Sequence, residues 1–416
     1  MNKNVHPRGK DLKPVRRRNE KGQTVRRPVI KRDIVKDNDI VRIKGDMDRT
    51  FLILVIVLIC FGSVMVFSAS YAYALAKYGN SYYFIEKQIG FVAVGMIFML
   101  LVATFADYIL VKKFTNIYFF TVVGMLIAVL IFGASEGEAK RWLFIPGTGF
   151  GVQPSEFMKL GLVLILAKYF SDSEDFLFRK TTKWEPVIRR LLIPLGIVVF
   201  VCLLVALEKH FSGVIILFMI GIIVIFAAGG QLKYMIGAAA SFVAVIVPAI
   251  LFVPYAKHRI DIWLHPENYS TQSDTWQTIQ GLNAVGSGGF FGVGLGQSLQ
   301  KHMFVSMPQN DFIFAIICEE LGFVGAVATI GLFLAFLWRG IVIAQKAPDT
   351  FSKLVVIGIV SKVAVQAVLN MAVVTNTIPN TGISLPFFSY GGSSLLMLLI
   401  EMGIVLSISR YSYQEK

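Results

Sequence analysis

The chain has 416 residues, of which 55% are hydrophobic and only 16% are charged, and its mean hydropathy is +0.66. This composition excludes an ordinary soluble domain and indicates a membrane protein that crosses the bilayer several times. The formal net charge of +14 does not indicate a nucleic-acid partner, because much of it lies in the first fifty residues, where basic side chains suit a membrane surface.

Residues 1–48 form the first predicted region, a hydrophilic tail that is rich in Arg and Lys and poor in aromatic residues. Such a segment cannot bury enough apolar surface to fold by itself. We therefore expect a basic, disordered tail that lies in the cytoplasm.

Apolar segments of roughly membrane-spanning length follow, since a helix needs about 20 residues to cross a bilayer. They are 50–71, 85–106, 115–134, 155–170, 189–207, 212–229, 233–253, 311–337, 353–376 and 389–409. Lys and Arg are concentrated in the connections that would face the cytoplasm together with the tail. The sequence thus predicts an all-α polytopic membrane protein with about ten transmembrane helices over 49–410 and a short cytoplasmic C-terminus, 411–416.

The longest connection, 254–310, would lie outside the cytoplasm between the seventh and eighth spans. More than fifty residues are too many for a simple connector, so this loop is a candidate functional element. Its part from Gly281 to Ser298 is glycine-rich and partly apolar. We expect that part to lie in the membrane interface as a re-entrant or amphipathic piece.

The stretch KHMFVSMPQNDFIFAIICEELG, residues 301–322, is the strongest functional candidate. A polar loop changes into an apolar helix at Asn310 and Asp311, which places Asp311 where water meets the membrane. A helix cap is the alternative interpretation, because Asn and Asp are favoured at helix starts.

Four further charges fall inside predicted spans, where ionisable groups are costly and mark function. Glu319 and Glu320 follow Asp311 by about two helical turns. Lys362 and Glu401 lie at similar depth in the ninth and tenth spans. We expect Lys362 to pair with Glu401 or with one of the two neighbouring glutamates.

Several polar groups fall on the outer side. Lys140 and Arg141 precede Trp142, an arrangement that suits an anionic amphiphile. Glu156 and Lys159 begin the fourth span, where a local salt bridge is the alternative to a functional role.

Another polar cluster, which includes His210, lies in the short turn EKHFSG, residues 208–213. Arg259 and Lys301 add cations to the long loop. Ser393 belongs to the segment LPFFSYGGSS, residues 385–394, whose small residues permit close helix approach and expose backbone donors.

Together these stretches resemble the SEDS family of bacterial membrane proteins (shape, elongation, division and sporulation), which includes FtsW, RodA and SpoVE. The similarity runs from MVFSAS at 65–70, through KRW and QPSE, to DFIFAIICEELG and LPFFSYGGSS. The turn EKHFSG resembles the division and sporulation branches more than the elongation branch. The chain is therefore similar to the FtsW and SpoVE members.

The resemblance implies a glycosyltransferase that polymerises lipid II, an undecaprenyl-diphosphate-linked disaccharide pentapeptide, on the outer face of the bacterial cytoplasmic membrane. It also implies a class B penicillin-binding protein as partner, together with division or sporulation proteins. The family's essential aspartate corresponds to Asp311, and Trp142, Glu156 and Lys159 correspond to cavity residues. Relatives often have Glu and His where this chain has Met307 and Gln309, so no role is transferred to those two side chains.

The implied reaction fits the residues. A sugar hydroxyl that attacks an anomeric carbon needs a general base, for which Asp311 is the candidate, and attack from the opposite face inverts the configuration. The departing diphosphate needs cations. Candidates for this role are Lys140, Arg141, Arg259 and Lys301, or a divalent ion such as Mg²⁺ or Mn²⁺, with no cofactor assigned.

Two other functions stay open at this point. A lipid II flippase could use Glu319, Glu320, Lys362 and Glu401 along its path, although the sequence has no evident internal repeat of the kind that transporters show. A non-catalytic scaffold of the septal synthesis complex would not need an ionised Asp311.

Overall fold

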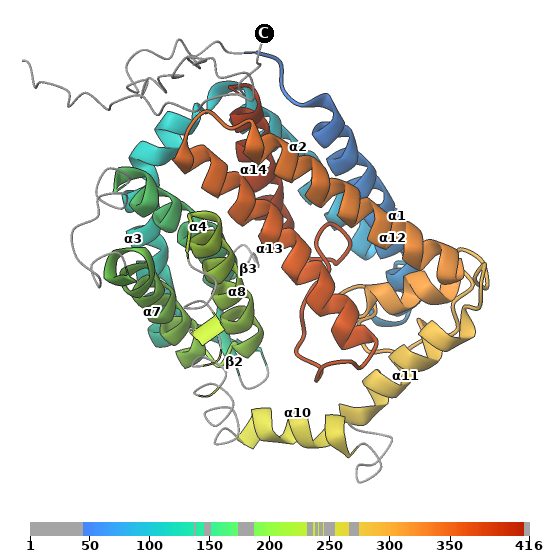
Figure 1. Ribbon diagram of the computed structural model, residues 1–416. Coiled ribbons are helices and arrows are strands. Elements are labelled where there is room, and N and C mark those ends of the chain that lie inside the picture. Colours follow the sequence, from blue (N-terminus) through green and yellow to red (C-terminus); the bar gives the residue numbers. More distant parts are fainter. Residues whose placement is uncertain are drawn as a thin grey trace, which may run out of the picture. The chain divides into compact units, whose positions relative to one another are not determined.

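The computed structural model describes residues 45–136, 139–144, 151–173, 187–230, 254–265 and 274–411, with a few isolated positions between 236 and 244. Helices make up nearly all of the regular structure in this part of the chain (Figure 1), so the all-α prediction is confirmed. Most of the predicted tail, the end of the C-terminus and most of the span expected at 233–253 lie outside the described residues.

Most of the described helices correspond to predicted spans. The helices are α1 (Arg49–Tyr78), α2 (Tyr83–Phe105), α3 (Tyr108–Phe132), α4 (Pro154–Asp172), the π-helical turn η1 (Ile188–Leu192), α7 (Ile193–Leu207), α8 (Phe211–Ala227), α10 (Pro254–Leu264), α11 (Asp274–Ser287), α12 (Ile313–Gln345), α13 (Thr350–Val374) and α14 (Gly392–Ser409). Within the described part, seven helices are long and apolar enough to cross a membrane: α1, α2, α3, η1 with α7, α12, α13 and α14. The protein is thus a multi-pass membrane protein.

Helix α13 lies at the centre of this arrangement. It packs against α12 on one side and against α4 and α8 on the other, while α14 packs along α2 (Figure 1). Small residues allow the last pair to approach closely, since a Cβ at Gly403 would lie 2.7 Å from the carbonyl oxygen of Met99. Such close packing replaces the hydrophobic effect as a driving force between helices in lipid.

The start of α1 is fixed by the side chain of Asp48. The Asp48 side chain accepts a hydrogen bond from the Phe51 amide at 2.9 Å and so caps the helix. The same carboxylate pairs with Arg339 of α12 through both oxygens, at 2.7 to 3.0 Å. One aspartate therefore begins α1 and ties it to α12.

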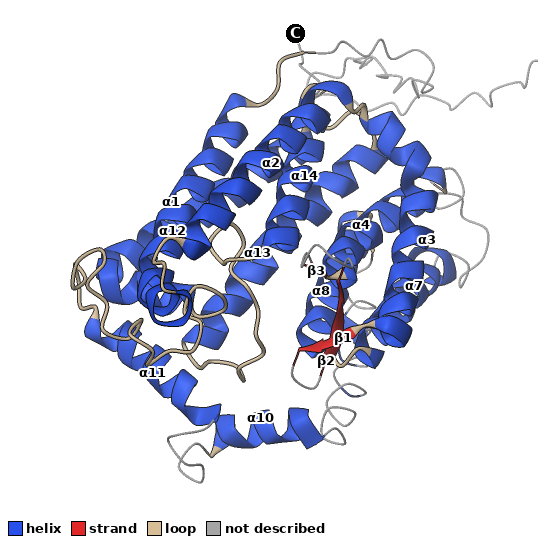
Figure 2. Cartoon of the chain, turned by 180° about the vertical axis from the view of Figure 1, so that it is seen from behind, coloured by secondary structure: helices blue, strands red, loops and turns tan. Residues whose placement is uncertain are grey.

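The connection predicted as a loop at 134–155 contains a small antiparallel sheet, drawn in red in Figure 2. Its strands are β1 (Ala134–Glu136), β2 (Ala139–Phe144) and β3 (Gly151–Val152), in the order β1-β2-β3. Leu143 pairs with Val152, directly before α4 begins at Pro154. The sheet thereby brings β2 beside the first turn of α4.

Helix α12 is broken at Gly322, whose φ of 65° and ψ of −159° are not helical. The amides of Phe323 and Val324 donate to the carbonyls of Gly289 and Phe290 at 2.9 and 3.2 Å. In return, the glycine-rich segment donates to carbonyls that the break frees. The amide of Val293 donates to the carbonyl of Glu319, and the amide of Gly294 donates to the carbonyl of Glu320, each at 3.0 Å. The glycine-rich segment is therefore inserted into the break of α12.

The segment 375–391, between α13 and α14, folds back among the helices. Phe387 has a φ of 67°, and its ring lies 5.9 Å from that of Phe336 in α12. Gly62, in the middle of α1, makes room for this backbone, because a Cβ there would lie 2.2 Å from the carbonyl oxygen of Phe387.

We predict that Gly62→Ala destabilises the protein, because the new methyl group must displace the Phe387 backbone. The expected loss is about 1–3 kcal/mol, seen as a lower Tm in detergent. Gly124→Ala in α3 is the matched control, since its Cβ would meet no atom within 4 Å. The control should keep or raise the Tm, and equal Tm values for the two variants would show that α1 does not hold this segment.

Candidate active site

Asp311 lies just before α12. The helix begins at Ile313 with Phe312 as its N-cap residue, so Asp311 is not the cap. The side chain is half-buried. Its carboxylate lies beside Gly382, where a Cβ would be 3.1 Å from Asp311 Oδ2. Because Gly382 has a φ of 63°, a larger residue there would be strained as well as crowded.

The backbone around Asp311 is bound to the segment 375–391. The Tyr390 amide donates to the carbonyl of Gln309 at 2.9 Å, and the Ser389 hydroxyl donates to that of Asn310 at 2.6 Å. The Asn370 amide nitrogen donates to the carbonyl of Asp311 at 2.7 Å. Three consecutive carbonyls before α12 are therefore held by other parts of the chain.

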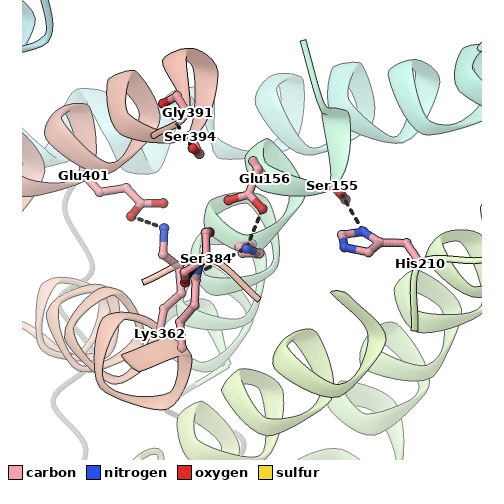
Figure 3. Close-up of polar contacts among 10 residues, drawn as sticks. Ser155, Glu156, His210, Lys362, Ser384, Gly391, Ser394 and Glu401 are labelled. Atoms are coloured by element: carbon pink, nitrogen blue, oxygen red, sulfur yellow. Dashed lines mark hydrogen bonds and ion pairs between the residues drawn. The ribbon is translucent and has the colours of Figure 1, made fainter. Parts of the chain in front are cut away.

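A second group of polar side chains comes from the start of α4 (Figure 3). Lys159 donates to Glu156 at 2.6 Å, and both side chains are buried. Lys159 also lies 3.5 Å from the side-chain oxygen of Gln366 on α13. Ser155 is 3.2 Å from Nδ1 of His210, which follows α7. The salt bridge that the sequence left as an alternative does form, but it is buried and linked to α13.

Lys362 of α13 pairs with Glu401 of α14, which is the first of the partners expected (Figure 3). A cavity of about 20 Å³ lies beside this pair. Its polar lining comes from Glu156, Lys362, Gln366, Ser384, Ser389 and Ser394. A polar space of this size can hold about one water molecule.

The β2 strand contributes Arg141 and Trp142, which are half-buried. Among the described residues, neither Nε of Arg141 nor Nε1 of Trp142 has a hydrogen-bond partner, although both atoms are buried. The side chain of Lys140 lies outside the described residues.

Arg259, in α10, donates from Nη1 to the carbonyl of Asn380. Trp263 in the same helix donates to the carbonyl of Asn376 at 2.9 Å, and Ser212 of α8 donates to that of Thr381. The turn that carries Gly382 is thus bound by α8 and α10. Ser393 is buried in the first turn of α14.

Lys301 has a different place from the one expected for a substrate-binding cation. It is fully buried and pairs with Glu320 at 2.8 Å. The Glu320 carboxylate also accepts a hydrogen bond from Ser68 of α1 at 2.5 Å, while Glu319 accepts the Leu299 amide at 2.9 Å. These charges anchor the long loop to α12 and α1, so we leave Lys301 out of the proposed diphosphate-binding set.

Burial perturbs two groups in the turn between α7 and α8. It raises the pKa of the Glu208 carboxyl to about 8, and both carboxyl oxygens lack a hydrogen-bond partner among the described residues. Burial, together with the positive charges of Arg141 and Lys159, lowers the pKa of His210 to about 3. At neutral pH both side chains are uncharged in the folded protein.

Comparison with known proteins identifies the family of this chain. A family model described as a cell cycle protein, of the FtsW/RodA/SpoVE type, matches residues 48–414. Stage V sporulation protein E of Bacillus subtilis is 38% identical over 373 residues, which cover 89% of this chain and 98% of that protein. This chain belongs to the FtsW/RodA/SpoVE family. The resemblance to the SEDS family is therefore confirmed.

Other relatives agree with this assignment. A protein of Trichlorobacter lovleyi, named probable peptidoglycan glycosyltransferase FtsW, is 36% identical over 367 residues, with 88% of this chain and 93% of that protein covered. Among solved structures, the chain is similar to one from a peptidoglycan synthase complex that coordinates polymerization and crosslinking. The TM-score is 0.72 at 25% identity, and the match covers 89% of this chain and 99% of the other.

RodA of Thermus thermophilus has the same fold, with a TM-score of 0.64 at 24% identity and coverage of 89% and 98%.

Two residues of the candidate site, Gln366 and Asn370, were not predicted from the sequence. They follow Lys362 at intervals of four, so all three lie on one face of α13. All three are at most 5% exposed. An amide repeated at helical spacing after an intramembrane lysine is the signal that could have revealed them.

The Glu208 carboxyl leads to a pH prediction. Its pKa is higher in the folded protein than the ordinary 4.5, so the unfolded chain binds fewer protons between pH 4.5 and about 8. Stability is therefore lost as the pH rises through that range. Glu208→Gln, which cannot ionise, should have a Tm above that of the parent protein by roughly 5 °C at pH 8.5 and by much less at pH 5.

The matched control is Glu86→Gln on the exposed surface of α2, which should show no such pH dependence. A Tm difference for Glu208→Gln that is equal at the two pH values would mean that Glu208 is ionised in the folded protein.

Proposed function

We propose that the protein is a peptidoglycan glycosyltransferase that polymerises lipid II into glycan strands on the outer face of the cytoplasmic membrane, in cell division or sporulation. One observation carries the assignment of its site. Asp311 does not cap its helix, and the hydrogen bonds to the carbonyls of Gln309, Asn310 and Asp311 fix the backbone on which its carboxylate is carried. The names of the relatives support the reaction.

In this proposal Asp311 is the general base. The 4-hydroxyl of the GlcNAc of one lipid II molecule gives its proton to the carboxylate as its oxygen attacks the anomeric carbon of a second chain. The bond from that carbon to the lipid diphosphate breaks, and the diphosphate leaves with the bonding electrons. Attack on the opposite face inverts the sugar, and no covalent bond to the enzyme forms.

The leaving diphosphate needs preorganised positive charge. Arg141 and Arg259 are our candidates, with Lys140 as a third. Trp142, which is half-buried, would offer its ring to the sugar. Among the described residues, no group of three His, Cys, Asp or Glu side chains could hold a metal ion. A divalent ion such as Mg²⁺ or Mn²⁺ stays an alternative source of that positive charge, because Mg²⁺ binds through one or two carboxylates together with substrate phosphates.

We further propose the orientation predicted from the sequence, with both termini in the cytoplasm and Asp311 outside. Arg339, Lys346, Lys353 and Arg410, which lie at one end of α12, α13 and α14, support this orientation through the positive-inside rule.

The partner would be a class B penicillin-binding protein that crosslinks the strands. The relative that belongs to a synthase complex for polymerization and crosslinking supports this proposal. The fitting surface is an exposed apolar face of α12 that includes Phe323, Val327, Leu334 and Trp338. Gly331 lies within this face and has open space above it. An exposed glycine allows another membrane helix to approach closely.

We predict that Gly331→Leu weakens copurification with the partner by about tenfold or more, because the side chain fills the space that a partner helix would occupy. The substituted side chain meets no atom of this chain within 4 Å at its Cβ, so the Tm should change little. Gly124→Leu in α3 is the control, because it is equally open. Normal copurification of Gly331→Leu would place the partner elsewhere.

The central test is polymerisation of purified lipid II, read as glycan length on a gel, with and without the partner. Asp311→Asn keeps the shape of the side chain and removes the base, so the rate should fall by about 100-fold or more. Asp349→Asn is the control. That residue caps α13 by accepting the Ser352 amide at 2.8 Å, a role that asparagine can also fill.

Three outcomes separate the alternatives. Polymerisation by the parent protein and by Asp349→Asn, but not by folded Asp311→Asn, supports the proposal. Full activity of Asp311→Asn would remove the general base from the mechanism. Absence of strands from every protein, even with the partner, would favour a flippase or a scaffold.

A further inference from the structure

One face of α13 carries three buried polar residues, Lys362, Gln366 and Asn370, each one turn from the next. Their side chains connect α13 to other parts of the chain. Lys362 pairs with Glu401 of α14. Gln366 donates to the carbonyl of Ser384 at 3.2 Å and lies near Lys159 of α4. Asn370 is the last of the three and the one beside Asp311.

Asn370 is fully buried, and its side-chain nitrogen makes two hydrogen bonds. One goes to the carbonyl of Asp311 at 2.7 Å and the other to the carbonyl of Ile383 at 2.6 Å. Ile383 directly follows Gly382, the residue beside the Asp311 carboxylate. A single amide therefore joins the backbone of Asp311 to the backbone that contacts its side chain.

Only one half of the Asn370 amide is used. Its Oδ1 atom is buried without a hydrogen-bond partner among the described residues. An unpaired buried acceptor costs stability, so the two bonds from the nitrogen are the favourable contribution of this side chain. The two donors on one nitrogen are what this position provides, and among side chains of this size an amide is the group that has them.

We propose that Asn370 is a positioning residue that sets the location of the Asp311 carboxylate relative to the reacting hydroxyl. This inference rests on the proposed role of Asp311 as general base. Asn370 acts through two carbonyls and does not touch the substrate. A misplacement of the base by about 1 Å can cost about 100-fold in rate.

The test compares Asn370→Ala and Asn370→Asp with the parent protein in lipid II polymerisation, with the partner present. Alanine removes both donors, and aspartate keeps the shape but places a carboxylate against two carbonyls. In both variants kcat should fall by about 100-fold while KM stays within about threefold. The acid limb of the pH profile of kcat, which reports the base in the complex, should move by about half a pH unit or more.

A second measurement does not need activity. Hydrogen exchange of the segments 309–313 and 383–390 should become faster in both variants, because the amide no longer holds them together. Val368→Ala is the control on the same helix, since that side chain is 66% exposed, and it should leave exchange, kcat and the pH profile unchanged. If alanine and aspartate prevent folding, Asn370→Gln keeps the amide one methylene further out, and it should lower kcat with the fold intact.

The proposal is overturned if a folded variant has a reduced amount of active enzyme but an unchanged pH profile and unchanged kcat per active site, which is what a purely structural residue would give. It is also overturned if activity and exchange match the parent protein. Asp311→Asn is measured alongside. If Asp311→Asn is inactive while the Asn370 variants behave like the parent protein, only the positioning role of Asn370 is wrong. If Asp311→Asn is fully active, the general-base assignment itself is wrong.

Discussion

The site depends on one constraint, which is that backbone groups away from water must find partners within the protein. The segment 375–391 is not helical, yet it folds back among α1, α12 and α13. Its carbonyls are met by side chains, with Ser212 bound to Thr381, Asn370 to Ile383 and Gln366 to Ser384. Each of these hydrogen bonds fixes the segment at a different position along α8 or α13. The need to satisfy the backbone thus produces the rigidity that a catalytic group requires.

A second non-helical piece precedes Asp311 in the chain. The break at Gly322 exposes carbonyls and amides of α12, and the glycine-rich segment 288–294 supplies the matching groups. The ion pair between Lys301 and Glu320 then fixes the loop that leads toward Asp311. Charged residues are costly in a membrane unless they are paired. In this region the ion pair between Lys301 and Glu320 holds irregular backbone in place.

The sequence was sufficient for features that depend on local chemistry. Hydropathy indicated the spans, and the cost of an isolated charge indicated a partner for Lys362. Features that depend on distant segments were different. The residues that accept or donate around Asp311 are separated from it by about 60 to 80 positions, and nothing local in the sequence relates them. The same reason applies to Lys301. Its place in the sequence predicts an exposed loop cation, but its side chain is buried, with Nζ 4.7 Å from the centre of the Tyr71 ring.

Buried charged and polar residues of α13 connect this helix to other parts of the chain. Lys362, Gln366 and Asn370 contact α14, the segment that follows α13, and the start of α12, in order along one helix face. A straight helix changes little in length or direction, so the three contacts keep a fixed spacing. Glu156 and Lys159 join the same face through Gln366. The polar group of α4 and the backbone around Asp311 are therefore both tied to a single helix, α13, and in the proposed mechanism the geometry of that helix sets their separation.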